Sequence, residues 1–359
     1  LGAEQQIEDY EMGKAEQQAL SITNPGAKTY GDDSFTLQAA GGSGTGAVTW
    51  SSGNESVAKV DPASGKITIT GAGRADITAK KAADNRYLAA SAALTIIVEK
   101  AKLTVTAENK TREYGKANPA LTYQITGFVN GESEAVLTKK PAASCSAGAD
   151  AAVGTHPITV SGGEADNYAF VYADGTLTVT KAGQTPPSIQ QGPKIDKTYG
   201  DDAFTLSVTG GSGTGAITWQ SSDESVASVD QAGKVTVHKP GKAVVTVTKA
   251  SDESYAEAQA FTAVTVGKAA LTVTAADAQK QYGEDNPAFS YKMAGFVGGD
   301  TKEDLAALPV LAADADKTAG VGNYAIRLSG GEDDNYDYVL NNAELTITPR
   351  PITIQADDK

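Results

Sequence analysis

The sequence predicts an all-β chain, folded as a tandem array of small modules, and two observations lead to this class. The segment from Lys28 to Ser52 returns with few changes from Lys197 to Ser222, and a fixed internal period is typical of repeat proteins. Short runs of alternating apolar and polar residues, separated by glycine and aspartate, recur in both copies and predict half-buried strands. The chain is therefore one unit written twice and made mainly of strands.

Two kinds of module alternate within this period. Lys-Ala pairs mark their starts, at Lys14, Lys100, Lys181 and Lys268. We expect modules of a first type at 14–99 and 181–267 and modules of a second type at 100–180 and 268–348. Residues 1–13 match nothing later and are expected to be a linker or tail. Residues 349–359 are in phase with the start of the second type and are expected to form the first strand of a further module.

The composition limits the class of protein. The 359 residues are too many for one core and suit two to four domains. The net charge of −14 argues against nucleic acid or an anionic membrane as partner, because both need basic patches. Cys145 is the single cysteine, which excludes an internal disulfide framework and suits a small buried apolar side chain. The sequence shows no long apolar run and no secretory leader, so its ends are expected to be cut.

The first module type is expected to be a small β-sandwich. Its predicted strands include 47–50, 57–60, 66–69 and 94–98, and several such strands at short spacing indicate two packed sheets. The only tryptophans, Trp50 and Trp219, are expected between the sheets. They lie 169 positions apart, whereas later matching tyrosines lie 168 apart, because the turn at 61–65 loses one residue in the second copy.

A specific resemblance is carried by four runs of the first type. They are Trp50–Ser52, Glu55–Asp61, Gly65–Lys66 and Gly71–Thr78. Together they resemble the bacterial immunoglobulin-like domain, group 2. The resemblance implies an Ig-like sandwich that serves as a repeating unit in bacterial surface proteins. The second copy departs from it at Lys239–Lys242, where a Pro-Gly turn replaces Gly-Ala-Gly, and this change leaves the expected fold intact.

The second module type is similar to the MBG domain, YGX type, of bacterial extracellular adhesin-like proteins. The resemblance rests on runs shared by its two copies: 118–123 with 286–291, 127–129 with 295–297, 161–164 with 329–332, and 166–168 with 334–336. The run Glu132–Lys139 is its one predicted helical turn, among strands at 103–107, 121–126, 158–160 and 177–180. We expect a mainly β module with one short helix, in either a sandwich or a β-grasp arrangement.

Motifs for catalysis are weak, and we expect no enzyme and no catalytic, cofactor or metal site. The run Gly42–Ala47 fits a loose phosphate-cradle pattern, but such a cradle must lead into a helix. Here it leads into a predicted strand, which favours a mobile turn. His156 and His238 are the only histidines, and their counterparts in the other copy are Tyr324 and Thr70. Neither histidine therefore belongs to a repeated site.

Carboxylates and tyrosines leave two further alternatives open. Acids cluster at 32–33, 201–202 and 332–337, and calcium prefers six to eight oxygen ligands, so a structural calcium role competes with the favoured role of solvated turn residues. The pair at Asp314 and Asp316 lacks the spacing of a calcium loop. Tyr-Gly pairs recur at 30, 114, 199 and 282, and tyrosines near predicted loops are found at 87, 168, 255 and 336. Packing at module ends is favoured over stacking on sugars.

The expected function is a section of a bacterial cell-surface or secreted repeat protein, located outside the cell. Four modules would form an extended, semi-rigid, monomeric stalk, because the short Lys-Ala junctions hold few glycines. The families imply an adhesive role toward host glycan, mucin or a host protein. The alternatives are a passive spacer and an accessory part of a surface carbohydrate enzyme. Specificity is expected in divergent loops such as 142–152 and 310–319.

Overall fold

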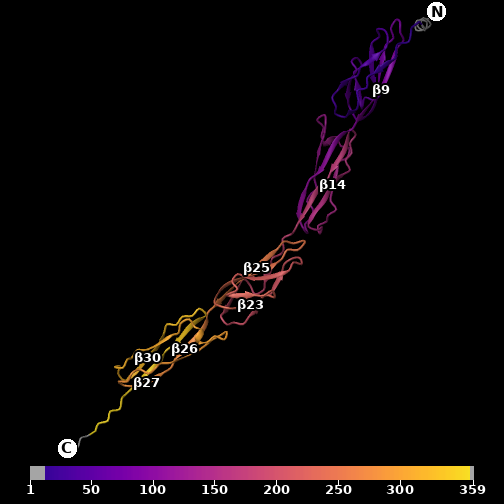
Figure 1. Ribbon diagram of the computed structural model, residues 1–359. Helices are drawn as coiled ribbons and strands as arrows, with labels where there is room; N and C mark the ends of the chain where they lie inside the picture. The colour runs from indigo at the N-terminus through magenta and orange to yellow at the C-terminus, as the bar shows by residue number, and fades with distance from the viewer. Residues whose placement is uncertain (1–12, 356–359) are drawn as a thin grey trace. The chain divides into compact units, whose positions relative to one another are not determined.

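The computed structural model describes residues 13–355 and divides the chain into two compact units, one ending at Thr180 and one beginning at Lys181 (Figure 1). Regular structure in the described residues is β-strand, apart from two single turns of 3-10 helix. The all-β prediction is thereby confirmed. Each unit holds two sandwich-like modules in sequence, and the units are described one at a time.

The first module of the first unit is an Ig-like sandwich. Its strands are β1 (Leu20–Ile22), β2 (Lys28–Thr29), β3 (Phe35–Thr36), β4 (Ala39–Gly41), β5 (Val48–Ser52), β6 (Ala58–Val60), β7 (Lys66–Ile69), β8 (Gly73–Lys81) and β9 (Ala90–Glu99). They form a four-stranded sheet β2-β9-β8-β5, a three-stranded sheet β3-β7-β6 and the pair β1-β4. Alternate residues of β8 and β9 point inward, as the period-two pattern predicts.

The tryptophan of this module lies in the core, as predicted. Trp50 is 7% exposed and packs with Ile67, Ile77 and Ile96, which are almost fully buried. The turn between β6 and β7 passes close over the indole. At Gly65 a Cβ atom would lie 2.8 Å from Cε2 of Trp50, and the backbone there has a φ of +70°. Glycine is therefore required at this position for two reasons: it adopts the positive φ, and it leaves room for the Trp50 ring.

The second module of the first unit is also built from two sheets. Its strands are β10 (Ala101–Ala107), β11 (Lys110–Glu113), β12 (Tyr123–Thr126), β13 (Ala142–Ser144), β14 (Gly154–Ser161), β15 (Tyr168–Ala173) and β16 (Gly175–Thr180). The sheets have the orders β12-β10-β15 and β11-β16-β14-β13, with β10/β15 and β11/β16 parallel. Val105, Ile158 and Leu177 from both sheets share one core. The structure thus takes the sandwich arrangement of the two alternatives.

The helical segment expected at Glu132–Lys139 is shorter than predicted. It is a single 3-10 turn, Glu134–Val136, with Ser133 at its N-cap. In the second unit the matching turn is Lys302–Asp304. The Asp304 carboxylate accepts hydrogen bonds from the Thr301 backbone N–H and hydroxyl, which stabilises this turn without a longer helix.

The second unit repeats this order. Its first module contains β17 (Pro187–Ile189), β18 (Lys194–Thr198), β19 (Phe204–Thr205), β20 (Val208–Gly210), β21 (Ile217–Ser221), β22 (Ala227–Val229), β23 (Lys234–Val237), β24 (Gly241–Lys249) and β25 (Ala258–Gly267). Its second module contains β26 (Ala269–Ala275), β27 (Ala278–Gln281), β28 (Tyr291–Ala294), β29 (Val310–Ala313), β30 (Gly322–Ser329), β31 (Tyr336–Asn341) and β32 (Ala343–Thr348). Trp219 is buried like Trp50. The main difference is that β18 is three residues longer than β2.

The two ends of the chain are described only in part. Of the predicted linker or tail, 1–12 lie outside the described residues. Residues 349–355 form no strand, and Ile352 and Ile354 are more than four-fifths exposed. That 349–359 form the first strand of a further module stays a prediction.

The packing of Gly65 against Trp50 predicts a large cost for adding one methyl group. Gly65→Ala should destabilise the first module by about 2 to 4 kcal/mol, because strain at positive φ adds to a clash with the ring. Gly26→Ala in the same module is the matched control: φ is +81° and no atom lies within 4 Å of the added Cβ. The control should cost about 1 kcal/mol. Equal losses of stability in calorimetry would contradict the packing argument.

Candidate functional site

The best-defined polar cluster lies inside each unit, where the Ig-like module meets the next module. In the first unit, β9 ends at Glu99 and β10 begins at Ala101, so Lys100 alone separates the two strands. The Ala101 N–H donates to the Asn167 carbonyl oxygen at 3.0 Å, and Lys100 Nζ donates to the Ala165 carbonyl at 2.9 Å. The connecting residue is therefore held by the second module.

Two tyrosines and one carboxylate form the centre of this junction in the first unit. The Tyr30 hydroxyl, from the first module, donates to Glu132 Oε1 at 2.8 Å. The Tyr168 hydroxyl, from the second module, donates to Glu132 Oε2. The two tyrosine rings meet edge to face with centroids 5.6 Å apart, and Phe128 packs on Tyr168 in the same manner. Both tyrosines are less than 7% exposed. One carboxylate thus bonds two tyrosines that are far from it in the sequence: Tyr30 is 102 positions away and Tyr168 is 36 positions away.

The same cluster recurs in the second unit with a shorter acid. Asp300 Oδ2 accepts from the hydroxyls of Tyr199 and Tyr336, both at 2.9 Å. The rings of these tyrosines are 5.7 Å apart at 90°, and Phe296 lies against Tyr336. Where Glu132 divides the two hydroxyls between its oxygens, Asp300 takes both on one oxygen. The arrangement survives the change of acid, so we name it the junction cluster in both units.

Glycine after the first tyrosine allows the second module to approach. A Cβ at Gly31 would lie 2.6 Å from Cγ2 of Val129, and one at Gly200 would lie 2.4 Å from Cβ and Cγ2 of Val297. The Tyr-Gly pairs at 30 and 199 are therefore contact residues of the junction cluster. The pairs at 114 and 282 lie at the far end of the second modules, where a Cβ at Gly115 or Gly283 would meet no atom within 4 Å.

One further hydrogen bond distinguishes the two junctions. In the first unit, Asn167 Oδ1 accepts from the Ala72 backbone N–H at 2.9 Å. The matching position in the second unit is Pro240, which has no N–H to donate. The Pro-Gly turn noted in the sequence leaves the sandwich intact, but it changes a contact between modules.

Burial and the acid both favour the neutral form of these tyrosines. Burial, which is the larger cause, and the hydrogen bond to Glu132 together raise the pKa of Tyr168 to about 12. Burial and the bond to Asp300 raise the pKa of Tyr199 to about 12 as well. The pKa of Tyr336 is also raised, mainly by burial. The hydroxyls therefore remain donors at any physiological pH.

The glycine-rich run Gly42–Ala47 is a structural loop. It leads into β5, as predicted, but its amides are already engaged. The Thr45 N–H donates to Asp84 Oδ2 at 2.7 Å, and the Ser43 N–H donates to Gln17 Oε1 at 3.0 Å. In the second unit Asp252 accepts from the Thr214 N–H in the same way. The backbone N–H groups of Thr214, Ser254 and Tyr255 lower the pKa of Asp252 to about 2. The Thr45 and Ser43 amides are thus bonded to side chains of the same module, and the turn that we expected to be mobile is tethered.

The remaining candidate residues do not converge. His156 Nε2 is hydrogen bonded to the Ala152 carbonyl and His238 Nε2 to the Ser228 hydroxyl, in different units. Cys145 is half-buried and packs against the core of its module. Asp314 pairs with Arg327, and Asp316 caps a turn at Thr318. Among residues 13–355, no group of three or more potential ligands of the His, Cys, Asp and Glu types could hold a metal ion.

The stretch of chain that the structure describes contains no helix with the length and apolar character needed to span a membrane.

Sequence reasoning found the tyrosines of the junction cluster but missed its acids and Asn167. A signal was present: Glu132 and Asp300 stand at the same place in the repeat, each directly after a glycine. The substitution of one acid for another at a fixed position could have marked them.

Family comparisons match all four modules. The MBG domain (YGX type) matches residues 103–178 and 271–346. The bacterial Ig-like domain (group 2) matches residues 201–260, and the immunoglobulin-like domain of intimin matches residues 31–83. The resemblance to alternating Ig-like and MBG repeats of bacterial surface proteins is therefore confirmed.

Comparison of this chain with whole proteins finds a relative in sequence, intimin, and several solved structures of low similarity. Intimin from Escherichia coli O111:H- is 29% identical over 221 residues, which cover 54% of this chain and 23% of intimin. The crystal structure of the surface-layer protein rSbsC(31-844) has a TM-score of 0.24 at 12% identity, covering 96% of this chain and 56% of that one. Mouse protocadherin-24 EC1-3 has a TM-score of 0.22 at 12% identity, covering 63% and 91%.

Removing one hydroxyl from the junction cluster should weaken the first unit. Tyr168→Phe takes a donor from Glu132 and an acceptor from the Val129 N–H, which bonds the Tyr168 hydroxyl at 3.1 Å. We expect a loss of about 1 to 3 kcal/mol in the free energy of unfolding. Tyr123→Phe in the same module is the control, and it should stay within about 0.5 kcal/mol. An equal effect of the two changes in denaturant titrations would argue against the cluster.

The raised tyrosine pKa values predict a loss of stability in alkali. A folded-state pKa of about 12 against about 10 unfolded means that the native state holds the proton more tightly. The contribution is complete below pH 10 and falls as pH rises toward 12. Melting temperatures measured from pH 9 to 12 should therefore drop, and Tyr168→Phe should remove part of the drop. A Tyr168→Phe profile parallel to the parent profile would contradict this assignment.

Proposed function

We propose that this array of alternating Ig-like and MBG domains is an extracellular stalk section of a bacterial surface or secreted repeat protein, with an adhesive role toward host glycan, mucin or a host protein. The family matches and the similarity to intimin support a surface repeat protein. The observation that carries the stalk is the junction cluster, which is built twice with different acids. A role in fixing the two modules to each other explains why both copies contain it.

The junction cluster favours a stiff connection over a tether. Flexible linkers are rich in glycine and serine, whereas a single lysine connects β9 to β10, and its ammonium group is bonded to the second module. Buried aromatic contacts and charge-assisted hydrogen bonds then fix the modules on either side. Each unit is proposed to act as a semi-rigid segment of the stalk, and the whole chain as a monomer.

The adhesive part of the proposal rests on the loops at the far end of the MBG modules. A buried basic side chain holds each of these loops through hydrogen bonds to its backbone. In the first unit Arg112 donates to the carbonyls of Gly148 and Ala149, and in the second unit Lys280 Nζ donates to the Asp316 carbonyl at 2.7 Å. The predicted loops 142–152 and 310–319 begin within strands β13 and β29, so that the loops themselves start at 145 and 314; the sequences of these loops differ between copies. A held loop of variable sequence is a suitable place for recognition.

Binding measurements decide between an adhesive stalk, a passive spacer and an accessory part of a surface carbohydrate enzyme. The full chain and its first unit, residues 14–180, should bind saturably to at least one member of a panel of mucins, glycans, and serum and matrix proteins. Variants with the 145–153 loop replaced by its counterpart should change that binding, whereas Tyr123→Phe should not. Absence of binding to the whole panel would favour the spacer, and binding to polysaccharides alone would favour the accessory role.

A further inference from the structure

The edge of strand β9 differs between the two Ig-like modules. In the second unit, β18 runs parallel to β25 and pairs from Lys194 with Ala263 to Thr198 with Gly267. The Ala263 N–H donates to the Pro193 carbonyl at 2.9 Å, which extends the ladder by one bond. In the first unit, β2 pairs with β9 only at Lys28 with Val98 and Thr29 with Glu99. Within the described residues, the edge of β9 before Val98 thus has no paired strand on this side.

The sequence explains why the first unit leaves this edge open. Five residues, 23–27, connect β1 to β2, whereas seven residues, 190–196, separate Ile189 from Lys197. The common register places Gly26 opposite Ile96, where the second unit has Ile195 opposite Val264. Gly26 has a φ of +81°, and its N–H donates to Asn24 Oδ1 at 2.9 Å. The chain turns away from the sheet at the point where the second unit continues as a strand.

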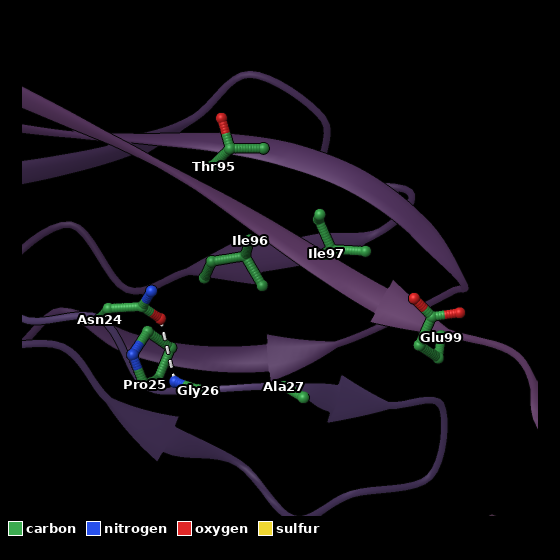
Figure 2. A pocket seen from close by; sticks show the side chains of 8 residues that line it. All are labelled: Asn24, Pro25, Gly26, Ala27, Thr95, Ile96, Ile97 and Glu99. Carbon is green, nitrogen blue, oxygen red and sulfur yellow. Dashed lines mark hydrogen bonds between the residues drawn. The ribbon is translucent and has the colours of Figure 1, made fainter.

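A pocket of about 280 Å³ lies where the strand is missing. Figure 2 shows it between the segment from Asn24 to Ala27 and the segment of β9 from Thr95 to Ile97. A Cβ at Gly26 would meet no atom within 4 Å. In the second unit the Ile195 side chain packs against the core at this place. The pocket therefore lies at the position that an aliphatic side chain fills in the sister module.

The residues around the pocket suit an added strand with an apolar side chain at its centre. Ile96 is 2% exposed and forms part of the core side, whereas Ile97 is 48% exposed at the rim. Glu99 also lines the pocket, and the whole chain carries a net charge of −14. In the second unit, Ile195 stands between Lys194 and Asp196, which pair with each other at 2.8 Å, on the strand that fills the site. Unpaired strand edges bind extended peptides through backbone hydrogen bonds, with pockets selecting side chains.

We propose that the first Ig-like module binds an extended peptide as an added strand, parallel to β9 at Thr95–Ile97. The peptide places one branched aliphatic side chain over Ile96, at the place that Ile195 takes in the second unit. This inference rests on the proposed adhesive role only in that it gives the chemical class of a protein partner. Its test uses no mucin, glycan or host protein, so the two proposals fail separately.

Hydrogen exchange on the full chain tests the site directly, with a synthetic peptide of residues 190–196 (QQGPKID), which ends before the positions that β2 occupies, as the probe. Without peptide, the Thr95 amide should exchange much faster than its counterpart Ala263. Saturating peptide should slow Thr95 by about tenfold and leave Ala263 unchanged. A control peptide with glycine in place of isoleucine should have no effect. The proposal is overturned if Thr95 is unaffected by the probe, or if both peptides act equally.

A reciprocal exchange of segments gives an independent test. Replacing residues 23–27 by the segment 190–196 should fill the pocket within the chain, protect Thr95 without peptide and abolish peptide binding. The reverse replacement in the second unit should expose Ala263 and create a site for the probe. Each segment already occurs at this place in one of the two Ig-like modules, and calorimetry would verify that the variants fold. Undiminished peptide binding to the filled variant would place the peptide elsewhere and contradict the proposal.

Discussion

A single carboxylate that accepts hydrogen bonds from two tyrosines is the interaction on which the organisation of each unit depends. Glu132 and Asp300 are contributed by the second module, and in each case one tyrosine comes from either side of the junction. A charged acceptor with neutral hydroxyl donors forms stronger hydrogen bonds than a neutral pair. The aromatic rings around it exclude water, so the acid is best satisfied when both modules are in place. The cluster thus couples two small modules that share no strand.

The small size of each core makes this coupling valuable. Aromatic residues are only 6% of the chain, and each sandwich relies on aliphatic side chains around one buried tryptophan or none. Small domains bury a smaller fraction of their surface and are correspondingly marginal in stability. In the first unit, Tyr30, Tyr168 and residues of both modules belong to one continuous cluster of buried side chains. Repeat proteins gain stability from such contacts between neighbours.

Sequence patterns were sufficient for the fold because strand periodicity and the internal repeat are properties of local residues. Trp50 and the Gly-Lys turn after it identified the sandwich and its core. The repeat also indicated that His156, whose counterpart is Tyr324, belongs to no repeated site, and the strand that follows Gly42–Ala47 argued against a phosphate cradle there. The partners of the loop, Gln17 and Asp84, could not be deduced, because they lie 26 and 39 positions from the residues they bond. Glu132 was missed for the same reason.

The central claim is that the junction cluster fixes the two modules of a unit in one relative orientation. Spin labels at Lys80 on β8 and Thr155 on β14, both exposed, with Cys145 replaced by serine, would report the distance between the modules of the first unit by double electron–electron resonance. A narrow distance distribution that broadens in a Tyr30→Phe, Tyr168→Phe double variant is the predicted result. A broad distribution in the parent chain, unchanged by the double variant, would contradict the account.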